Sequence, residues 1–313
     1  MQNNNPQSTF GPDLNEYKDQ VNFSVLAYTV DFIYLRASGS ATGRVRVDAK
    51  FVEYAKACRN FGIPSGAYHY AVASNDPTTA DVQCDGFINA LQSGYGTKDY
   101  GDLFPVIDVE APADKSISTT TLVNWVDRFR KRFESKTRRR LMIYTGTFFA
   151  EIYNDFKVPG KGYPLSNMPL WIAMYKEIPS NPPFPPDLGG WKRWKLWQYT
   201  EKGNIRGVNP PVDLNWGPDS LDFIMPPRNV KGLSATKDQN NIYIKWDKNP
   251  DKDLLGYNLF INSEWIGTVS RDAISYVFKR SRMNLAPGAP IEVSIEAFDF
   301  DGDFSKQRTK VTI

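Results

Sequence analysis

Short apolar runs alternate with longer amphipathic segments through the first two thirds of the chain. The short runs are rich in branched and aromatic residues, which is typical of buried strands. A repeated order of strand and then helix predicts parallel strands joined by right-handed crossovers. The strand candidates are "FIYLR" (32–36), "GAYHYA" (66–71), "FPVIDVE" (104–110), "LMIYT" (141–145), "LWIAMY" (170–175), "KLWQYT" (195–200) and "PVDLNW" (211–216).

Three amphipathic segments between the early strands predict helices. One ends before Gly62, one begins near Thr78, and one covers 118–133. No clear helical pattern separates the last three strand candidates, so we predict an irregular (β/α) TIM-like barrel rather than a regular eightfold one. The apolar stripes of the three helices are Phe51, Ala55, Cys58 and Phe61; Ala80, Cys84, Phe87 and Leu91; and Leu122, Val126, Phe129 and Phe133.

The pattern changes around "IMPPRNV" (224–230). Beyond it, runs such as "NNIYIKWD" and "IEVSIEAFD" alternate with a period of two and are separated by turn signals. We therefore predict an α/β barrel followed by a small all-β sandwich, with Trp246 in the core of the sandwich. The expected division is a flexible N-terminus at 1–9, the barrel at 10–226 and the sandwich at 227–313.

Composition narrows the class of protein. The chain has 313 residues, 41% of them hydrophobic, and a net charge of +3, which argues against a dedicated nucleic-acid binder. No apolar run is long enough for a membrane span. The basic run "RFRKRFESKTRRR" (128–140) has two interpretations, a solvated helix face and loop or attraction to a polyanionic surface.

Cysteine and histidine usage limits the chemistry further. Cys58 and Cys84 lie inside predicted helices, and we expect them to be buried free thiols. The one histidine is His69, which excludes a triad with a second histidine, and no spacing matches a metal motif. We expect no metal and no cofactor.

Four carboxylates stand where strand candidates end or turn. Asp108 and Glu110 alternate along one strand and so fall on one face, with α-carbons roughly 6–7 Å apart. Asp13 in "FGPDLNEY" and Asp213 in "PVDLNW" occupy comparable places. Because active sites of such barrels lie at the carboxyl ends of the strands, we expect these carboxylates to meet there.

Aromatic residues cluster at the same strand ends, and they have two interpretations. Some are expected to pack the barrel and its shell, while the others provide faces on which sugar rings stack. Carboxylates together with aromatic faces suit glycosidic bond cleavage. The candidates for substrate binding are Tyr68, Tyr70, Tyr144, Trp171, Tyr175, Trp197 and Tyr199.

The ordered series "GPD", "FIYLRAS", "GIPSGAYHY", "PVIDVE", "LMIYTG", "LWIAMY", "LWQYT" and "VDLNW" resembles glycoside hydrolase family 25, the Chalaropsis-type lysozymes of bacteria and phages. The resemblance implies a muramidase that hydrolyses the β-1,4 bond between N-acetylmuramic acid and N-acetylglucosamine in peptidoglycan. It places the acid/base glutamate on Glu110, its partner on Asp108, and the other two aspartates on Asp13 and Asp213. Pro12, Leu14 and Asn15 depart from the family's usual residues around Asp13.

The chemistry of these residues agrees with the implied roles. We expect Glu110 to have a raised pKa as general acid and Asp108 to stay ionised. A short separation between them predicts net retention, through attack either by Asp108 or by the substrate's own acetamido group. If Asp13 or Asp213 instead activates water across the cleft, the outcome is inversion.

Two further expectations concern context. "MQNNNPQSTF" shows no secretory signal, which suits release through a holin or mounting on a virion. The C-terminal region resembles a fibronectin type III module, with a role as spacer, as a dock for phage tail or virion proteins, or in wall binding. The competing function is a catalytically silent glycan-binding or virion structural protein that keeps the barrel, and a chitin-like substrate is a third alternative.

Overall fold

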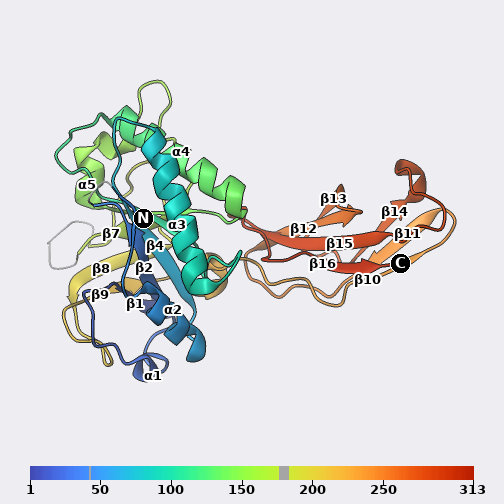
Figure 1. Cartoon of the computed structure of the whole chain (residues 1–313), viewed down its shortest axis with the longest axis horizontal. Helices are drawn as coiled ribbons and strands as arrows, with labels where there is room; N and C mark the ends of the chain where they lie inside the picture. Colours follow the sequence, from blue (N-terminus) through green and yellow to red (C-terminus); the bar gives the residue numbers. More distant parts are fainter. Residues whose placement is uncertain (42–43, 176–182) are drawn as a thin grey trace. The chain divides into compact units, whose positions relative to one another are not determined.

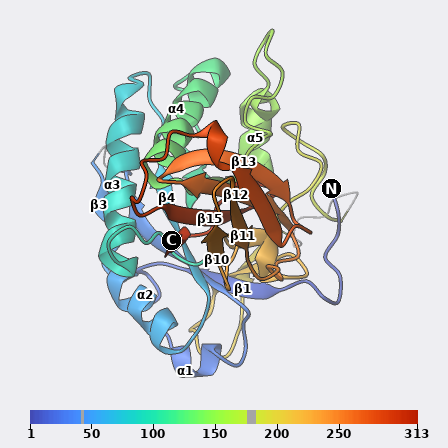
Figure 2. The same ribbon diagram turned by 90° about the vertical axis from the view of Figure 1, so that its right-hand side faces the viewer.

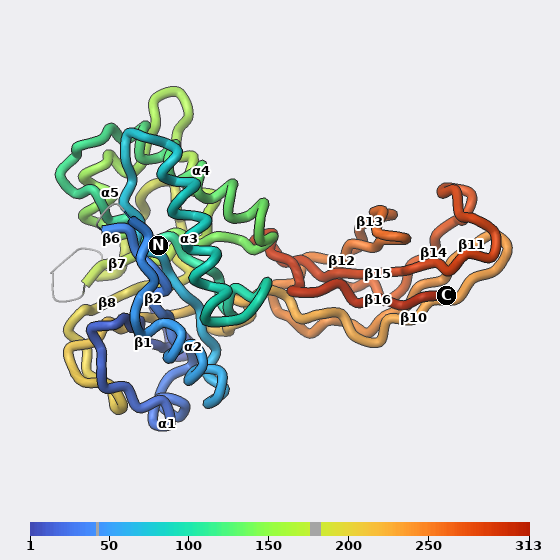
Figure 3. The backbone as a smooth tube through the Cα atoms, in the orientation of Figure 1, coloured from blue at the N-terminus to red at the C-terminus, as the bar shows by residue number. Residues whose placement is uncertain are grey.

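The computed structural model describes residues 1–41, 44–175 and 183–313. The chain divides into two compact units, Met1–Ile224 and Met225–Ile313, and Figure 3 traces it through the first and then the second. None of the helices in the described ranges is long and apolar enough to cross a membrane.

In the described part of the first unit, eight strands close a barrel (Figure 1). Neighbours are parallel from β1 to β8, whereas β9 is antiparallel to both β8 and β1. A short strand, β3 (Arg46–Val47), extends β2. The barrel strands in order are β1 (Phe10–Leu14), β2 (Ile33–Gly39), β4 (Ser65–Ala71), β5 (Val106–Val109), β6 (Met142–Gly146), β7 (Leu170–Ala173), β8 (Leu196–Gly203) and β9 (Val212–Trp216).

The predicted helices are confirmed, with one error in their apolar stripes. Phe61 is 49% exposed, because α2 ends one residue earlier and the chain turns away at Gly62, whose φ is +68°. Within the described residues no helix separates β7, β8 and β9, as the pattern predicted. The helices are α1 (Phe23–Leu26), α2 (Phe51–Asn60), α3 (Thr78–Tyr95), α4 (Thr119–Thr137), α5 (Thr147–Ile152), η1 (Asn154–Phe156) and η2 (Leu221–Ile224).

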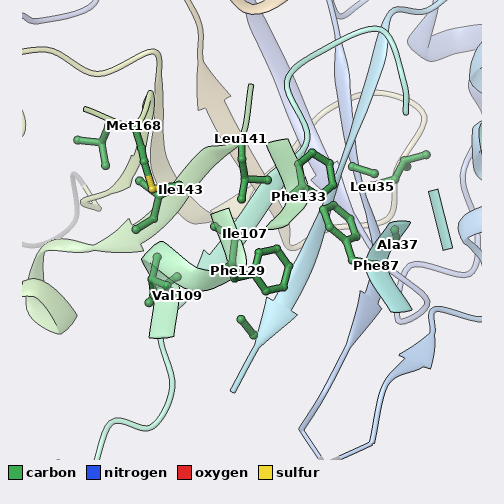
Figure 4. Close-up of a cluster of buried hydrophobic side chains, with 14 of the residues drawn as sticks. Leu35, Ala37, Phe87, Ile107, Val109, Phe129, Phe133, Leu141, Ile143 and Met168 are labelled. Carbon is green, nitrogen blue, oxygen red and sulfur yellow. The ribbon is translucent and has the colours of Figure 1, made fainter. Parts of the chain in front are cut away.

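The apolar faces of α3 and α4 pack against the outer surface of the barrel strands. Phe87, Phe129 and Phe133 are fully buried, and Figure 4 shows them gathered with Ile107 of β5 and Ile143 of β6. Burial of large aromatic side chains is the main driving force for holding these helices on the barrel.

The buried cysteines and the histidine belong to this packing. Cys58 and Cys84 are free and buried, as predicted. The His69 ring lies 5.8 Å from the Phe129 ring and accepts or donates hydrogen bonds with Ser38 and Gln83. Burial lowers the pKa of His69 to about 4, so this residue is a neutral core group.

Carboxylates neutralise most of the basic run on α4. Across the α3–α4 boundary, Arg128 pairs with Asp81 at 2.6 Å, and Arg132 and Lys136 both pair with Asp85 at 2.7 Å. Cations that are already paired attract a distant polyanion weakly. This pairing favours the interpretation as a solvated helix face over attraction to a polyanionic surface.

The residues before β1, expected to form a flexible tail, make hydrogen bonds to the first unit. The Met1 amino group lies 2.8 Å from a carboxylate oxygen of Asp187. Gln2 donates to the Trp194 carbonyl, and the Trp194 indole donates to the Gln2 carbonyl, each at 2.8 Å.

The second unit is all-β and has two antiparallel sheets and its own core, which confirms the predicted fold class. Trp246 is buried against Tyr257, with ring centroids 5.5 Å apart. Figure 2 shows β12, β13 and β15 side by side. One sheet contains β10 (Ser234–Lys237), β11 (Asn241–Lys245) and β14 (Ser275–Lys279), the other contains β13 (Glu264–Ser270), β12 (Leu254–Ile261), β15 (Glu292–Asp299) and β16 (Thr309–Thr312), and η3 (Arg280–Arg282) follows β14.

Candidate active site

A pocket of about 300 Å³ opens at the carboxyl ends of the parallel barrel strands. Asp108 occupies the next-to-last position of β5, and Glu110 follows the strand directly. All four carboxylates singled out in the sequence line this pocket. The lining residues are Asp13, Asn15, Arg36, Tyr68, Tyr70, Asp108, Glu110, Tyr144, Trp171, Tyr175, Gln198, Glu201 and Asp213.

Strand register brings residues from distant parts of the sequence into this pocket. Asp13 of β1 stands directly opposite Asp213 of the antiparallel β9. Asp108 lies between Tyr70 of β4 and Tyr144 of β6. Closure of the barrel through the β1–β2 and β1–β9 pairings therefore completes the ring of carboxylates.

Asp13 is held by a buried network of hydrogen bonds. Its Oδ2 accepts from Gln198 Nε2 and from Asn215 Nδ2, both at 2.9 Å. The Gln198 carbonyl oxygen accepts from the hydroxyls of Tyr144 at 2.9 Å and Tyr175 at 3.1 Å. Burial raises the pKa of Asp13, while hydrogen bonds from Asn215, Gln198 and Asp213 oppose the rise.

Asp108 differs from the sequence-based expectation that it stays ionised. Burial raises its pKa well above the usual range, and Glu110 and Asp13 add repulsion. Among the described residues, Arg36 is the group that lowers the pKa. Its Oδ1 is buried without a hydrogen-bond partner. The strand pattern places Asp108 on the pocket face, but it does not show that the side chain is 5% exposed and has little to stabilise a negative charge.

Glu110 and Asp213 also favour the protonated form. Burial and the charge of Asp13 raise the pKa of Glu110, as expected for a general acid. Burial, the charge of Asp13 and a hydrogen bond to Asp13 raise the pKa of Asp213 to about 8, although Lys18 opposes the rise. Asp213 therefore retains its proton near neutral pH, and the shift of the Glu110 pKa has the same direction.

The structure divides the aromatic candidates into two groups. Tyr68, Tyr70, Tyr144, Trp171 and Tyr175 line the pocket.

Trp197 and Tyr199 do not line it, contrary to their place among the substrate-binding candidates. Side chains alternate along β8, so Gln198 faces the pocket and its two neighbours face away. Trp197 is fully buried and donates from its indole to the Met174 carbonyl, and Tyr199 stacks on Trp216 at 5.2 Å.

Several polar groups at or next to the pocket were not among the candidates predicted from the sequence. Arg36 bonds to Asp48 at 2.8 Å and to Glu16 at 3.0 Å, and it lines the pocket beside Asp108. The sequence feature that could have identified Arg36 is its position as a cation at the end of an apolar strand candidate. Gln198 could have been found by alternation within "LWQYT", whereas Asn15, Glu201 and Asn215 had no clear signal.

Clustered carboxylates are typical ligands of metal ions, and the pocket contains several in the part of the chain that the structure describes. No group of three or more histidine, cysteine, aspartate or glutamate side chains there is arranged to hold a metal ion. Asp13 accepts hydrogen bonds from the side-chain amides of Gln198 and Asn215.

The profile of glycosyl hydrolases family 25 matches residues 12–208, a region that contains Asp13, Asp108 and Glu110. The chain belongs to glycosyl hydrolases family 25. It is therefore a glycoside hydrolase, and the family resemblance expected from the ordered motifs is confirmed.

This family 25 enzyme is similar to several known proteins. It is 29% identical over 210 residues to Lysozyme M1 of Streptomyces globisporus, a match that covers 66% of each chain. The crystal structure of the Clostridium perfringens spore cortex lytic enzyme SleM is 60% identical, with a TM-score of 0.98 over 100% of this chain and 99% of that one. The catalytic domain of endolysin ply40 from bacteriophage P40 of Listeria monocytogenes is 25% identical, with a TM-score of 0.55 over 70% of this chain and 97% of that one.

Proposed function

We propose that this family 25 enzyme is a muramidase that hydrolyses the β-1,4 bond between N-acetylmuramic acid and N-acetylglucosamine in peptidoglycan. The observation that carries the proposal is the pocket, in which Asp108 and Glu110 lie at the end of β5 and aromatic side chains form part of the lining. The family match and the similarity to Lysozyme M1 support the same class of substrate.

In the proposed reaction, Glu110 is the general acid that protonates the leaving oxygen. Burial and the charge of Asp13 raise its pKa, which favours the protonated form that a general acid requires. Asp108 stabilises positive charge at the anomeric centre in its ionised form, which it reaches by releasing its proton to water before the glycosidic bond breaks. Arg36 is the nearby group that favours this ionised form. Asp13 and Asp213 are further polar residues in the lining of the pocket.

We further propose net retention at the anomeric carbon. Asp108 and Glu110 are two residues apart at one strand end, which favours the short separation of carboxyls that retaining enzymes use. Attack by Asp108 and attack by the substrate's acetamido group both produce a first-formed β anomer. Following the anomeric proton by NMR tests the proposal, and an initial α product would transfer the base role to Asp13 or Asp213.

The source of the peptidoglycan has two candidates. Similarity to a spore cortex lytic enzyme at 60% identity along the whole chain favours cortex peptidoglycan. Phage-type lysis, with release through a holin or mounting on a virion, is the alternative, supported by the more distant phage endolysin. Comparing initial rates on purified cortex and on vegetative wall distinguishes the two, because a cortex enzyme should act faster on cortex.

The second unit is proposed to be a fibronectin type III-like module. Its two packed sheets of three and four strands and the buried Trp246 support this likeness. We propose that this module either spaces the barrel from a partner or binds the wall. Under the phage alternative, it docks on virion proteins. A pull-down of Met225–Ile313 on insoluble peptidoglycan tests wall binding.

Digestion of purified peptidoglycan, followed by identification of the new reducing end, tests the central proposal. A muramidase leaves N-acetylmuramic acid at the reducing end. N-acetylglucosamine there, or activity only on chitin-like chains, would contradict the substrate assignment, and the absence of any product would favour the catalytically silent alternative.

A further inference from the structure

Asp13 differs from the other pocket carboxyls because two amide side chains donate to a single one of its oxygens. Gln198 Nε2 and Asn215 Nδ2 each lie 2.9 Å from Asp13 Oδ2. The three residues are 5%, 4% and 0% exposed, so water does not compete for these bonds. Hydrogen bonds from fixed donors to a buried carboxyl stabilise its ionised form.

Each of the two amides also makes hydrogen bonds on the side that lies away from Asp13. The Gln198 carbonyl oxygen accepts from the hydroxyls of Tyr144 and Tyr175, and the Asn215 carbonyl oxygen accepts from the Trp171 indole N–H at 2.8 Å. An indole N–H can only donate, and the Asn215 amide nitrogen also donates to the Gly11 carbonyl at 3.2 Å. The Asn215 amide nitrogen must therefore face Asp13. The Gln198 amide lies with its nitrogen toward Asp13 and its oxygen toward the two hydroxyls.

Where β1 pairs with β9, Asp13 and Asp213 must share a proton. Their α-carbons pair in register and their carboxyls are hydrogen-bonded to each other. Two carboxyls that are hydrogen-bonded to each other do not both ionise, so one of them donates. Asp13 already accepts from two amide N–H groups, which stabilise its ionised form, and this assigns Asp213 as the donor.

Other charges around the pair act on Asp213 as well. Glu201 of β8 repels its ionised form, and Lys18, from the loop after β1, attracts it. Tyr68 and Tyr144 face Asp13, together with Asp108 and Glu110 from the β5 end. Burial and the bond to Asp13 outweigh Lys18, in agreement with the raised pKa of Asp213.

We propose that Gln198 and Asn215 are positioning residues that keep Asp13 ionised and thereby hold a proton on Asp213, so that Asp213 meets the glycan as a neutral carboxyl whose O–H is donated to Asp13. The part of this inference that concerns glycan binding rests on the proposed muramidase function. Where the proton lies in the free enzyme does not depend on that function.

Gln198→Glu tests the first half of the proposal. A carboxylate at 198 cannot donate to Asp13, whereas its protonated form can replace the amide N–H. We expect kcat/KM at pH 7 to fall about 100-fold, and we expect the loss to shrink as the pH is lowered and the introduced carboxyl gains a proton. A uniform loss at every pH, or no loss, would overturn the proposal.

Gln83→Glu is the matched control. Gln83 is likewise a buried amide, 6% exposed, but it bonds to the Val72 backbone and His69, away from the pocket. Its substitution should lower the melting temperature and leave the pH profile of kcat/KM unchanged. Should Gln198→Glu fail to fold, Asn215→Asp applies the same change to the other donor.

Infrared spectroscopy of the resting full-length chain tests the second half without using activity. The carbonyl stretch of a protonated carboxyl should be present at pH 7 and should lose one component in Asp213→Asn. An unchanged carbonyl band in that variant would overturn the placement of the proton. If the unmodified chain releases no reducing ends, the proposed muramidase function fails, and the infrared difference still decides where the proton lies.

Discussion

At the residue scale, the pocket contains many acidic groups and few groups that favour their charge. Asp13, Asp108, Glu110, Glu201 and Asp213 line it, and Arg36 is the cation among the described lining residues. Arg36 is itself bonded to Asp48 and Glu16. Retained protons are the physical consequence, because a buried carboxyl without a counter-charge is more stable in its neutral form.

Replacing Glu110 with glutamine should abolish hydrolysis and leave the fold intact. The amide keeps the volume but cannot deliver a proton to the leaving oxygen, a loss that costs on the order of 10² to 10⁴-fold in rate. Release of reducing ends from peptidoglycan measures it. Glu53→Gln, an exposed change on α2, is the control, and more than half of the activity remaining in Glu110→Gln would contradict the acid role.

The pH dependence of stability should report the protonation of Asp213. Its pKa is about 8 in the folded chain against 3.8 for an unperturbed group, so above pH 4 the unfolded chain releases a proton that the folded chain keeps. Stability from this group therefore falls as the pH rises from about 4 to about 8.

Asp213→Asn should remove that dependence. The asparagine amide still donates to Asp13, so we expect the variant to have a higher melting temperature at pH 8 and little change at pH 4, measured by circular dichroism. Asp219→Asn, which changes an exposed carboxyl, should show no such difference between the two pH values. The assignment would be contradicted if Asp213→Asn raised the melting temperature, compared with the unmodified chain, by more at pH 4 than at pH 8.

At the element scale, α4 has one face that stabilises the barrel and another that contributes little. Phe129 is fully buried on the barrel side, whereas Arg128, its neighbour in sequence, forms a partly exposed pair with Asp81. Burial is not screened by water or salt, and surface ion pairs are.

Phe129→Ala should therefore destabilise the first unit far more than Arg128→Ala. Core truncations of phenylalanine cost about 3–5 kcal/mol, and an exposed ion pair contributes about 1 kcal/mol or less. Urea denaturation followed by tryptophan fluorescence compares the two. Equal losses would show that the ion pairs across α3 and α4, and not the aromatic stripe, hold this helix in place.

At the scale of the whole molecule, each unit has its own buried cluster. That of the first unit includes residues from Leu14 to Leu214, and that of the second includes residues from Val230 to Ala297. A separate core is the physical condition for independent folding. The pocket is lined by residues of the first unit alone.

A chain that ends at Pro226 should stay folded and cut soluble glycan fragments at a rate similar to that of the full chain. Circular dichroism and reducing-end assays measure the two properties. Action on intact cortex or whole wall should fall if the second unit binds the wall. Insolubility of the shortened chain under conditions that keep the full chain in solution would contradict the independence of the first unit.

The sequence by itself determined the elements and much of the site. Helical spacing identified the buried faces of α3 and α4, and alternation placed Asp108 and Glu110 on one face of β5. These signals are local, because the periods of 3.6 and 2 depend only on backbone geometry. The ordered motifs pointed to the family through their resemblance to glycoside hydrolase family 25, because each motif is a contiguous stretch of the chain.

Only the tertiary structure decided which groups meet and which carry protons. Asp13 and Asp213 are 200 positions apart, and the antiparallel β9 that pairs them is set by closure of the barrel. Closure also buries Asp108 without a partner for Oδ1 and brings Gln198 within hydrogen-bond distance of Asp13. Burial, register and the direction of an amide depend on contacts between distant segments, and no local period in the sequence encodes them.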